Sequence, residues 1–197
     1  MRIRLEGLDQ ARRDIERIGR DFPTVLAQGL NRTAEAMYRE AERALDQHID
    51  RPTPYTARGI KLFKARADRL DAELFIQPDQ AKYLKYAIEG GRIPTNLTPT
   101  RATRLNQYGN VPGMQRGMEG IKGRAQTKFI GEINGILGVW QRYGRGGTKL
   151  KLLVKVERDA PRTARLPWYE TAERVASRRL QRDIGVAIGR ALQAGRV

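Results

Sequence analysis

The strongest constraint on the fold is a pair of β-rich runs joined by Asn134-Gly135. KFIGEI precedes this dipeptide and ILGVWQRY follows it. Asn-Gly favours a tight hairpin turn, because both central residues must adopt positive φ. A Gly-rich turn, YGRGGTK, then leads to LKLLVKV, in which apolar residues alternate with Lys151 and Lys155. The sequence therefore predicts a three-stranded antiparallel meander with one buried face.

Apolar residues recur at helical spacing in the N-terminal part of the chain. The stripe begins at Leu8, is interrupted near Phe22 and Pro23, and resumes to about His48. This pattern predicts a short helix, a break at the proline and then a long helix. The prolines of RPTP at 51–54 end that helix, because proline and the residue before it resist helical geometry.

The rest of the chain completes an α+β pattern. DAELFIQPD at 71–79 predicts a short strand, and a closing helix is expected from Pro167, with arginines along its polar side. Residues 91–127 are rich in Gly, Pro, Thr, Asn and Arg, which indicates a long irregular arm. We expect an α+β fold in which N-terminal helices and a C-terminal helix pack on a small antiparallel sheet. Its single domain would comprise residues 1–90, with the N-terminal helices and first strand, and 128–197, with the remaining strands and closing helix.

Charge is unevenly distributed along the chain. The 197 residues carry 38 Lys and Arg against 22 Asp and Glu, a formal net charge of +16. Residues 1–50 hold 9 basic and 10 acidic side chains, 51–127 hold 14 and 6, and 128–197 hold 15 and 6. Such basicity favours nucleic acid, an acidic membrane face or an acidic protein surface as the partner, and charge alone does not choose among them.

Catalytic, cofactor and metal sites have no support in the sequence. The absence of cysteine excludes disulfides, cysteine metal sites and thiol nucleophiles. The single histidine, His48, sits near Asp46 and Asp50, where a helix-terminal charge is favoured over a weak metal site. GRGG at 144–147 precedes Thr148-Lys149 and a strand, which predicts a hairpin turn and not a phosphate-binding loop.

No segment has the apolar length of a signal peptide core or a membrane span, so we expect no membrane association and folding in a cytoplasm. The arm at 91–127 has six basic side chains and one acid, with Tyr108 as its sole aromatic. It could contact phosphates or a neighbouring subunit, and the subunit contact is favoured because a polar segment usually orders on a partner. Trp168 fits a core position, whereas Trp140 fits a core or an interface equally well.

With these motifs placed, the chain resembles the tail-completion and head-to-tail-joining proteins of tailed phages, the neck-protein family that includes minor tail protein Z of phage lambda. Over most of the chain, four stretches carry the resemblance: GLDQARRDIERIGRDFPTVLAQGLNRTA; RPTPYTARGI; YLKYAIEGG with YGNVPGMQRG; and GVWQRYGRGG through LLVKVERDAPRTARLPWYETAERV. Tyr86, Glu89 and Gly90 occupy the tyrosine, acid and glycine positions of the family pattern, and Arg165, Pro167 and Trp168 occupy the start of its closing helix.

The resemblance implies a non-enzymatic α+β subunit of a homo-oligomeric ring, expected to be a hexamer, in the virion neck or upper tail after assembly in the host cytoplasm. Implied partners are the tail terminator, the tail tube and the connector or portal adaptor, and a ring channel would allow non-specific contact with DNA. Glu89 would pair with an arginine of the next subunit, and Gly90 and Gly91 would let the arm leave at an angle that a Cβ obstructs. The subunit-interface candidates are Tyr86, Glu89, Gly90, Arg92, Arg101, Arg104, Trp140, Arg142, Arg165 and Trp168.

Two other functions compete with a role in the virion. The first is a basic nucleic-acid-binding protein that contacts phosphates without sequence specificity through the arm or the closing helix. The second is an enzyme such as a nuclease, which would need a metal-carboxylate or histidine-centred constellation that the sequence lacks.

Overall fold

The computed structural model describes residues 8–123 and 126–194 and confirms the α+β class. The described chain forms two compact units, where one domain was expected. Unit 1 contains the chain up to Gln47, Pro54–Ala81 and the chain from Pro167, and unit 2 contains His48–Thr53 and Lys82–Leu166. Helix α3, Pro78–Ile88, begins in unit 1 and continues in unit 2.

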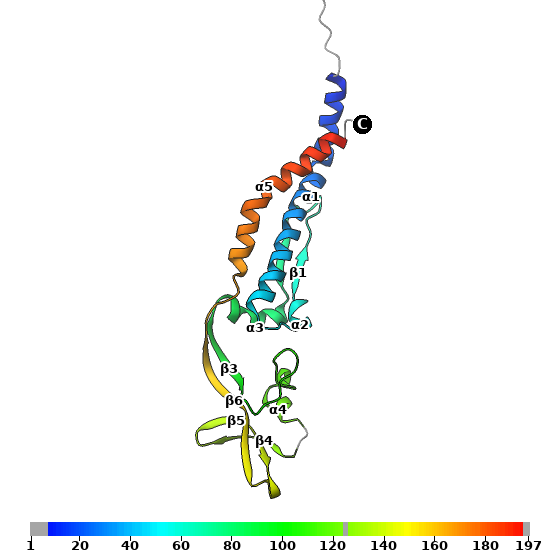
Figure 1. The fold of residues 1–197 in the computed structure, drawn as a ribbon. Helices are drawn as coiled ribbons and strands as arrows, with labels where there is room; N and C mark the ends of the chain where they lie inside the picture. The colour runs from blue at the N-terminus through cyan, green and yellow to red at the C-terminus, as the bar shows by residue number, and fades with distance from the viewer. Residues whose placement is uncertain (1–7, 124–125, 195–197) are drawn as a thin grey trace, which may run out of the picture. The chain divides into compact units, whose positions relative to one another are not determined.

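Unit 1 is built on two long helices, α1 (Leu8–His48) and α5 (Trp168–Ala194), which run side by side (Figure 1). Their buried residues are mostly small, including Ala27, Ala34, Ala36, Ala41, Ala44 and Ala187. Small side chains allow the two backbones to approach closely. At Gly29, an added Cβ would lie 2.8 Å from the Cα of Ile184, so glycine is required for this approach.

A two-stranded antiparallel sheet completes unit 1, with the short helix α2 (Pro54–Ala57) before it. Strands β1 (Ile60–Phe63) and β2 (Glu73–Ile76) pair from Ile60↔Ile76 to Phe63↔Glu73. The segment after β1 is fixed to α1 by Asn31, whose amide donates to the Ala65 carbonyl at 2.9 Å and accepts from the Ala65 N–H at 2.8 Å.

Unit 2 contains a four-stranded antiparallel sheet in the order β3-β6-β5-β4. The strands are β3 (Gly91–Pro99), β4 (Lys128–Ile133), β5 (Ile136–Tyr143) and β6 (Lys149–Arg162). Helix α4 (Gly117–Lys122) follows the 3-10 turn η1 (Met114–Arg116) and contacts β4 and β5. One buried hydrophobic cluster of unit 2 consists of Val111, Ile121, Val139, Leu153 and Val154.

The predicted meander is confirmed by β4, β5 and β6. Asn134 and Gly135 join β4 to β5 with φ of 52° and 73°, as the Asn-Gly turn requires. The GRGG segment forms a 3-10 turn, η2 (Arg145–Gly147), between β5 and β6, so the predicted hairpin turn is confirmed. The strand predicted at 71–79 and the closing helix predicted from Pro167 are confirmed by β2 and α5.

Two sequence predictions were wrong. Helix α1 passes through Pro23 without the expected break. Proline removes one backbone hydrogen bond, and the buried positions that resume at Val25 keep the segment helical by packing. The arm expected at 91–127 is irregular only in part, because residues 91–99 form β3 and pair with β6. The sequence analysis also missed β1 and α3.

Candidate interaction site

Two of the stretches that carry the family resemblance meet at the end of α3. The Ala87 carbonyl accepts hydrogen bonds from the backbone N–H groups of Arg165, at 2.7 Å, and Leu166, at 2.8 Å. Ala87 belongs to YLKYAIEGG, and Arg165 and Leu166 belong to the RTARLPW segment. The carbonyls of a helix's last turn have no partner within the helix, so these bonds satisfy one of them and fix the chain before α5.

The glycine pair that follows α3 is required by the local geometry. Gly90 has φ of 75° and Gly91 has φ of 106°. An added Cβ at Gly90 would lie 3.0 Å from the Arg162 carbonyl oxygen and 3.1 Å from the Ala164 nitrogen. The expected obstruction by a Cβ is therefore found at Gly90, whereas a Cβ at Gly91 would meet no atom within 4 Å and only its positive φ favours glycine. The chain continues into β3 and not into an irregular arm.

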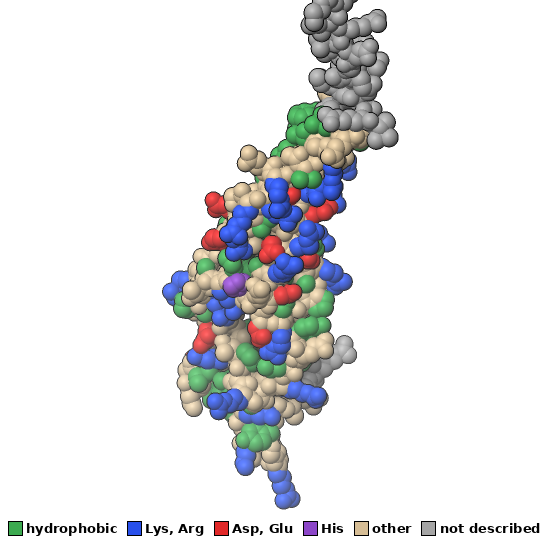
Figure 2. All heavy atoms as spheres, turned by 45° about the horizontal axis from the view of Figure 1, so that its top comes forward, with side chains coloured by type: hydrophobic (Ala, Val, Ile, Leu, Met, Phe, Trp, Pro, Cys, Tyr) green, Lys and Arg blue, Asp and Glu red, His purple; other side chains and the backbone are tan. Residues whose placement is uncertain are grey.

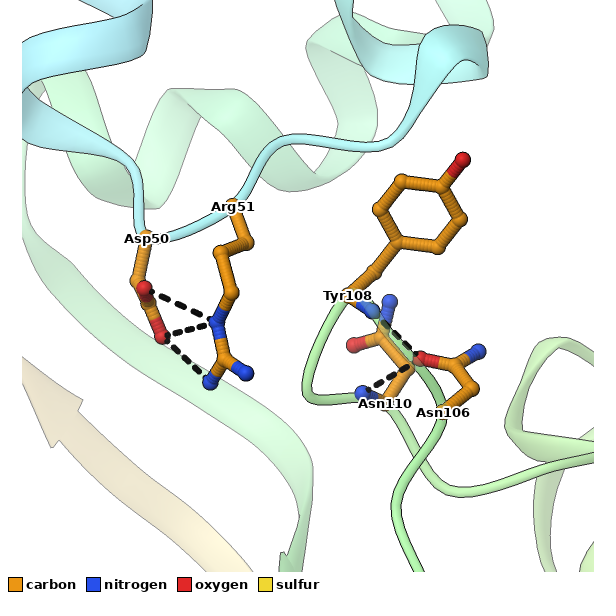
Figure 3. Close-up of polar contacts among 5 residues, drawn as sticks. All are labelled: Asp50, Arg51, Asn106, Tyr108 and Asn110. Carbon is orange, nitrogen blue, oxygen red and sulfur yellow. Dashed lines mark hydrogen bonds and ion pairs between the residues drawn. The ribbon is translucent and has the colours of Figure 1, made fainter.

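A third contact joins RPTP to YGNVPGMQRG (Figure 3). Asn106 Oδ1 accepts from the backbone N–H groups of Tyr108 and Asn110, each at 3.0 Å, which closes a tight loop. Gly109, at φ 72°, is in close contact with Arg51, because an added Cβ would lie 2.5 Å from Arg51 Nη2. Arg51 in turn donates to Asp50 at 3.0 Å. We name residues 50–51, 86–92, 106–110 and 159–166, all of unit 2, the motif cluster.

The ion pairs of the motif cluster join residues within the cluster, and their side chains are exposed to solvent. Arg92 Nε lies 2.7 Å from Asp159 Oδ2. This hydrogen bond holds the pKa of Asp159 below its ordinary value. The hydrogen bond from Arg51, with further attraction from Arg51 and Arg165, likewise lowers the pKa of Asp50. Glu89 is exposed, and its carboxylate has no partner among the described residues. Glu89 is therefore the carboxylate of this cluster that is free for another chain.

Five interface candidates lie outside the motif cluster: Arg101, Arg104, Trp140, Arg142 and Trp168. Arg101 and Arg104 are exposed in a segment that Thr100 and Thr103 fix to β6, by donating to the carbonyls of Leu152 and Leu153. Part of the expected arm is thus held by its own chain. Trp168, half-buried, is the first residue of α5 in unit 1.

Trp140 and Arg142 project from the same strand, β5. The Trp140 Nε1–H donates to the Gly131 carbonyl at 3.0 Å, and its strand neighbour in register is Phe129. The Arg142 guanidinium lies 5.0 Å from the Phe129 ring centroid. Tyr86, in α3, is half-buried with Lys85 Nζ 4.9 Å from its ring centroid. The indole of Trp140 therefore has its polar atom satisfied within its own sheet.

An arginine-lined groove in unit 1 was not predicted. It has a volume of about 500 Å³, and α1 and α5 line it with five arginines and one acid around Ala36 and Val175. The arginines are Arg39, Arg43, Arg174, Arg178 and Arg179, and the acid is Glu40, which pairs with Arg43. Its sequence signal is the four-residue spacing of Arg39 with Arg43 and of Arg174 with Arg178, which places each pair on one helix face.

Neither a metal-binding cluster of side chains nor a membrane-spanning helix is found among the described residues. No group of three or more His, Asp or Glu side chains in 8–123 and 126–194 is arranged to hold a metal ion. His48 is exposed at the end of α1. No described helix is long and apolar enough to cross a bilayer.

Comparison with known proteins gives no neighbour for this arrangement. No protein-family model, curated protein or solved structure matches the chain.

Proposed function

We propose that the chain is a non-enzymatic structural protein of a tailed-phage virion, which completes the upper end of the tail and helps join tail to head as a ring subunit in the neck. The observation that carries the proposal is the motif cluster. Residues from three of the four stretches that resemble neck proteins contact one another there: Ala87 bonds to Arg165 and Leu166, and Gly109 lies against Arg51. Contact among them is expected if they form one functional unit.

The motif cluster also provides groups suited to a subunit boundary. Glu89 is exposed without a described partner, and Arg165 is exposed on the neighbouring segment. In a ring, the carboxylate of one subunit would meet an arginine of the next, and charge-assisted pairs of this kind supply orientation as well as affinity. The neighbours of the protein within the ring would be copies of the same chain. The tail terminator, tail tube and connector or portal adaptor would bind above or below the ring.

Deletion of the gene from a phage genome that encodes it tests the proposal. Electron micrographs of the lysate should show filled heads and nearly complete tails, with few joined particles, and infectivity should return when the intact gene is supplied in trans. Empty heads, or tails without tubes, would assign the protein to a different assembly step.

A further inference from the structure

The positive charge of the protein is concentrated between residues 82 and 166, which hold 17 basic and five acidic side chains. Within them, residues 141–151, which we name the basic hairpin, carry four cations and no acid. They comprise the end of β5, the turn η2 and the start of β6. At the lower end of the view in Figure 2, where the yellow β5–β6 hairpin of Figure 1 lies, the charged side chains in sight are Lys and Arg.

Strand register places three of these cations, which lie on both faces of the hairpin, and Arg145 lies in the turn. Tyr143 pairs with Lys149 and Gln141 with Lys151, whereas Arg142 pairs with Leu150. Cross-strand partners share a face, so Lys149 and Lys151 flank Tyr143 on one side and Arg142 lies on the other. Tyr143 is 45 % exposed at this end of the sheet.

Aromatic rings, and not carboxylates, position two of the four cations. Lys151 Nζ lies 5.7 Å from the Tyr143 ring centroid, and Arg142 stacks over Phe129. Among the described residues no carboxylate lies within 4.0 Å of the cationic nitrogens of Arg142, Arg145, Lys149 or Lys151. The hairpin therefore presents four cations without a described carboxylate partner, two of them held in place by aromatic rings.

We infer that the basic hairpin binds the phosphate backbone of duplex DNA without sequence specificity. A two-stranded β-ribbon fits the major groove of B-form DNA, where cations on its two faces reach the phosphates of both strands. Neutralising phosphates releases condensed counterions, which drives binding. A single exposed aromatic falls short of a stacking platform for single strands, so duplex DNA is the favoured ligand. This inference does not depend on the neck assignment.

Binding of the purified full-length protein to a short fluorescent DNA duplex, measured by anisotropy at several salt concentrations, tests the inference. The test variant combines Arg142→Gln, Arg145→Gln, Lys149→Gln and Lys151→Gln. The matched control combines Arg39→Gln, Arg43→Gln, Arg174→Gln and Arg178→Gln, which removes the same charge from the arginine-lined groove of unit 1. The slope of log K against log salt should become shallower by about 3 to 4 in the test variant and by less than about 1 in the control.

Several results would overturn the inference: equal losses of duplex binding in both variants, a parent protein that does not bind duplex, or tighter binding of a single strand that Tyr143→Leu abolishes.

Circular dichroism shows whether each variant folds. If the fourfold variant does not, Arg145→Gln and Lys149→Gln, which alter neither aromatic contact, should each reduce the slope by about 1. Normal binding by either single variant would count against the hairpin. The deletion phenotype of the neck proposal is a separate readout.

Discussion

Among single residues, Asp183 carries a negative charge into the helix pair of unit 1. Its side chain is 3 % exposed. It accepts a hydrogen bond from Thr33 Oγ1 of α1 at 3.1 Å and one from Arg179 Nε at 3.2 Å. Burial by itself would raise the pKa of this carboxyl, but the bonds from Thr33 and Arg179 and the charge of Arg182 outweigh it, and the pKa is lowered.

The lowered pKa of Asp183 predicts a loss of stability in acid. A carboxyl whose pKa is lower in the folded state contributes stability above its unfolded pKa of about 4, and this contribution disappears as the pH falls through the folded value. Asp183→Asn should lower the free energy of unfolding at pH 7 by about 1 to 3 kcal/mol and weaken the acid dependence. Urea unfolding at pH 7 and pH 3 measures both. Glu173→Gln, at an exposed position of the same helix, is the control, and a control as unstable as Asp183→Asn would refute a specific role for the buried carboxylate.

Glu89 gives the corresponding prediction for assembly. Because its carboxylate is exposed and has no described partner, Glu89→Gln should leave the melting temperature of the isolated protein unchanged. If Glu89 pairs with an arginine across a subunit boundary, the variant should weaken the free energy of subunit association by about 2 to 5 kcal/mol per contact. Incorporation into particles, compared with the parent protein, measures that loss. Early melting would make Glu89 an internal structural residue, and normal incorporation would remove the support for this contact.

The sequence predicts those residues whose role is local. Asn134 and Gly135 were predicted to adopt positive φ because a tight hairpin demands it of adjacent residues. Asp183 was not predicted to be buried, since its partner Thr33 lies 150 residues away and nothing in the arginine-rich surroundings of Asp183 distinguishes it. The contact of Arg51 with Gly109 was missed for the same reason.

Among the elements, α1 shows most clearly that packing can override a local signal. Pro23 predicts a break, yet α1 is continuous from Leu8 to His48, and its later residues are buried and contact α5 at Gly29 and Thr33. Helix α3 was missed because its apolar positions, between Pro78 and Gly90, span too few turns to show a clear period.

Close approach of α1 to α5 at Gly29 gives a prediction for these helices. Gly29→Ala would place a Cβ 2.8 Å from the Ile184 Cα, so the helices must separate, at a cost of about 1 to 3 kcal/mol. Gly185→Ala is the control, because a Cβ there meets no atom within 4 Å. Alanine also removes the flexibility of glycine in a helix, which should raise the free energy of unfolding by about 0.5 to 1 kcal/mol. Thermal unfolding should therefore shift in opposite directions. Equal shifts would mean that helix propensity, and not the contact, dominates.

For the whole molecule, the sequence predicted the fold class and the strand order of the meander, but not the division into two units. Hydrophobic periodicity indicates which face of a helix or strand is buried. It does not indicate which other element covers that face. Unit 1 draws on three separate parts of the chain and unit 2 on two. None of the boundaries between the two units falls within residues 91–127, the segment that was expected to be an irregular arm.

The pairing of β3 with β6 also determines when the sheet can form. Strand β3 pairs Gly91 with Arg162 and Pro99 with Val154, partners 71 and 55 residues later in the chain, whereas β4 and β5 meet across a two-residue turn. At ordinary rates of synthesis, β3 is made roughly 3 to 14 s before the residues of β6 with which it pairs. Loop closure also favours the local strands, so the meander should form first and β3 should add to it last. Pulsed hydrogen exchange during refolding should protect the amides of β4 and β5 before those of β3, and simultaneous protection of all four strands would rule out this order.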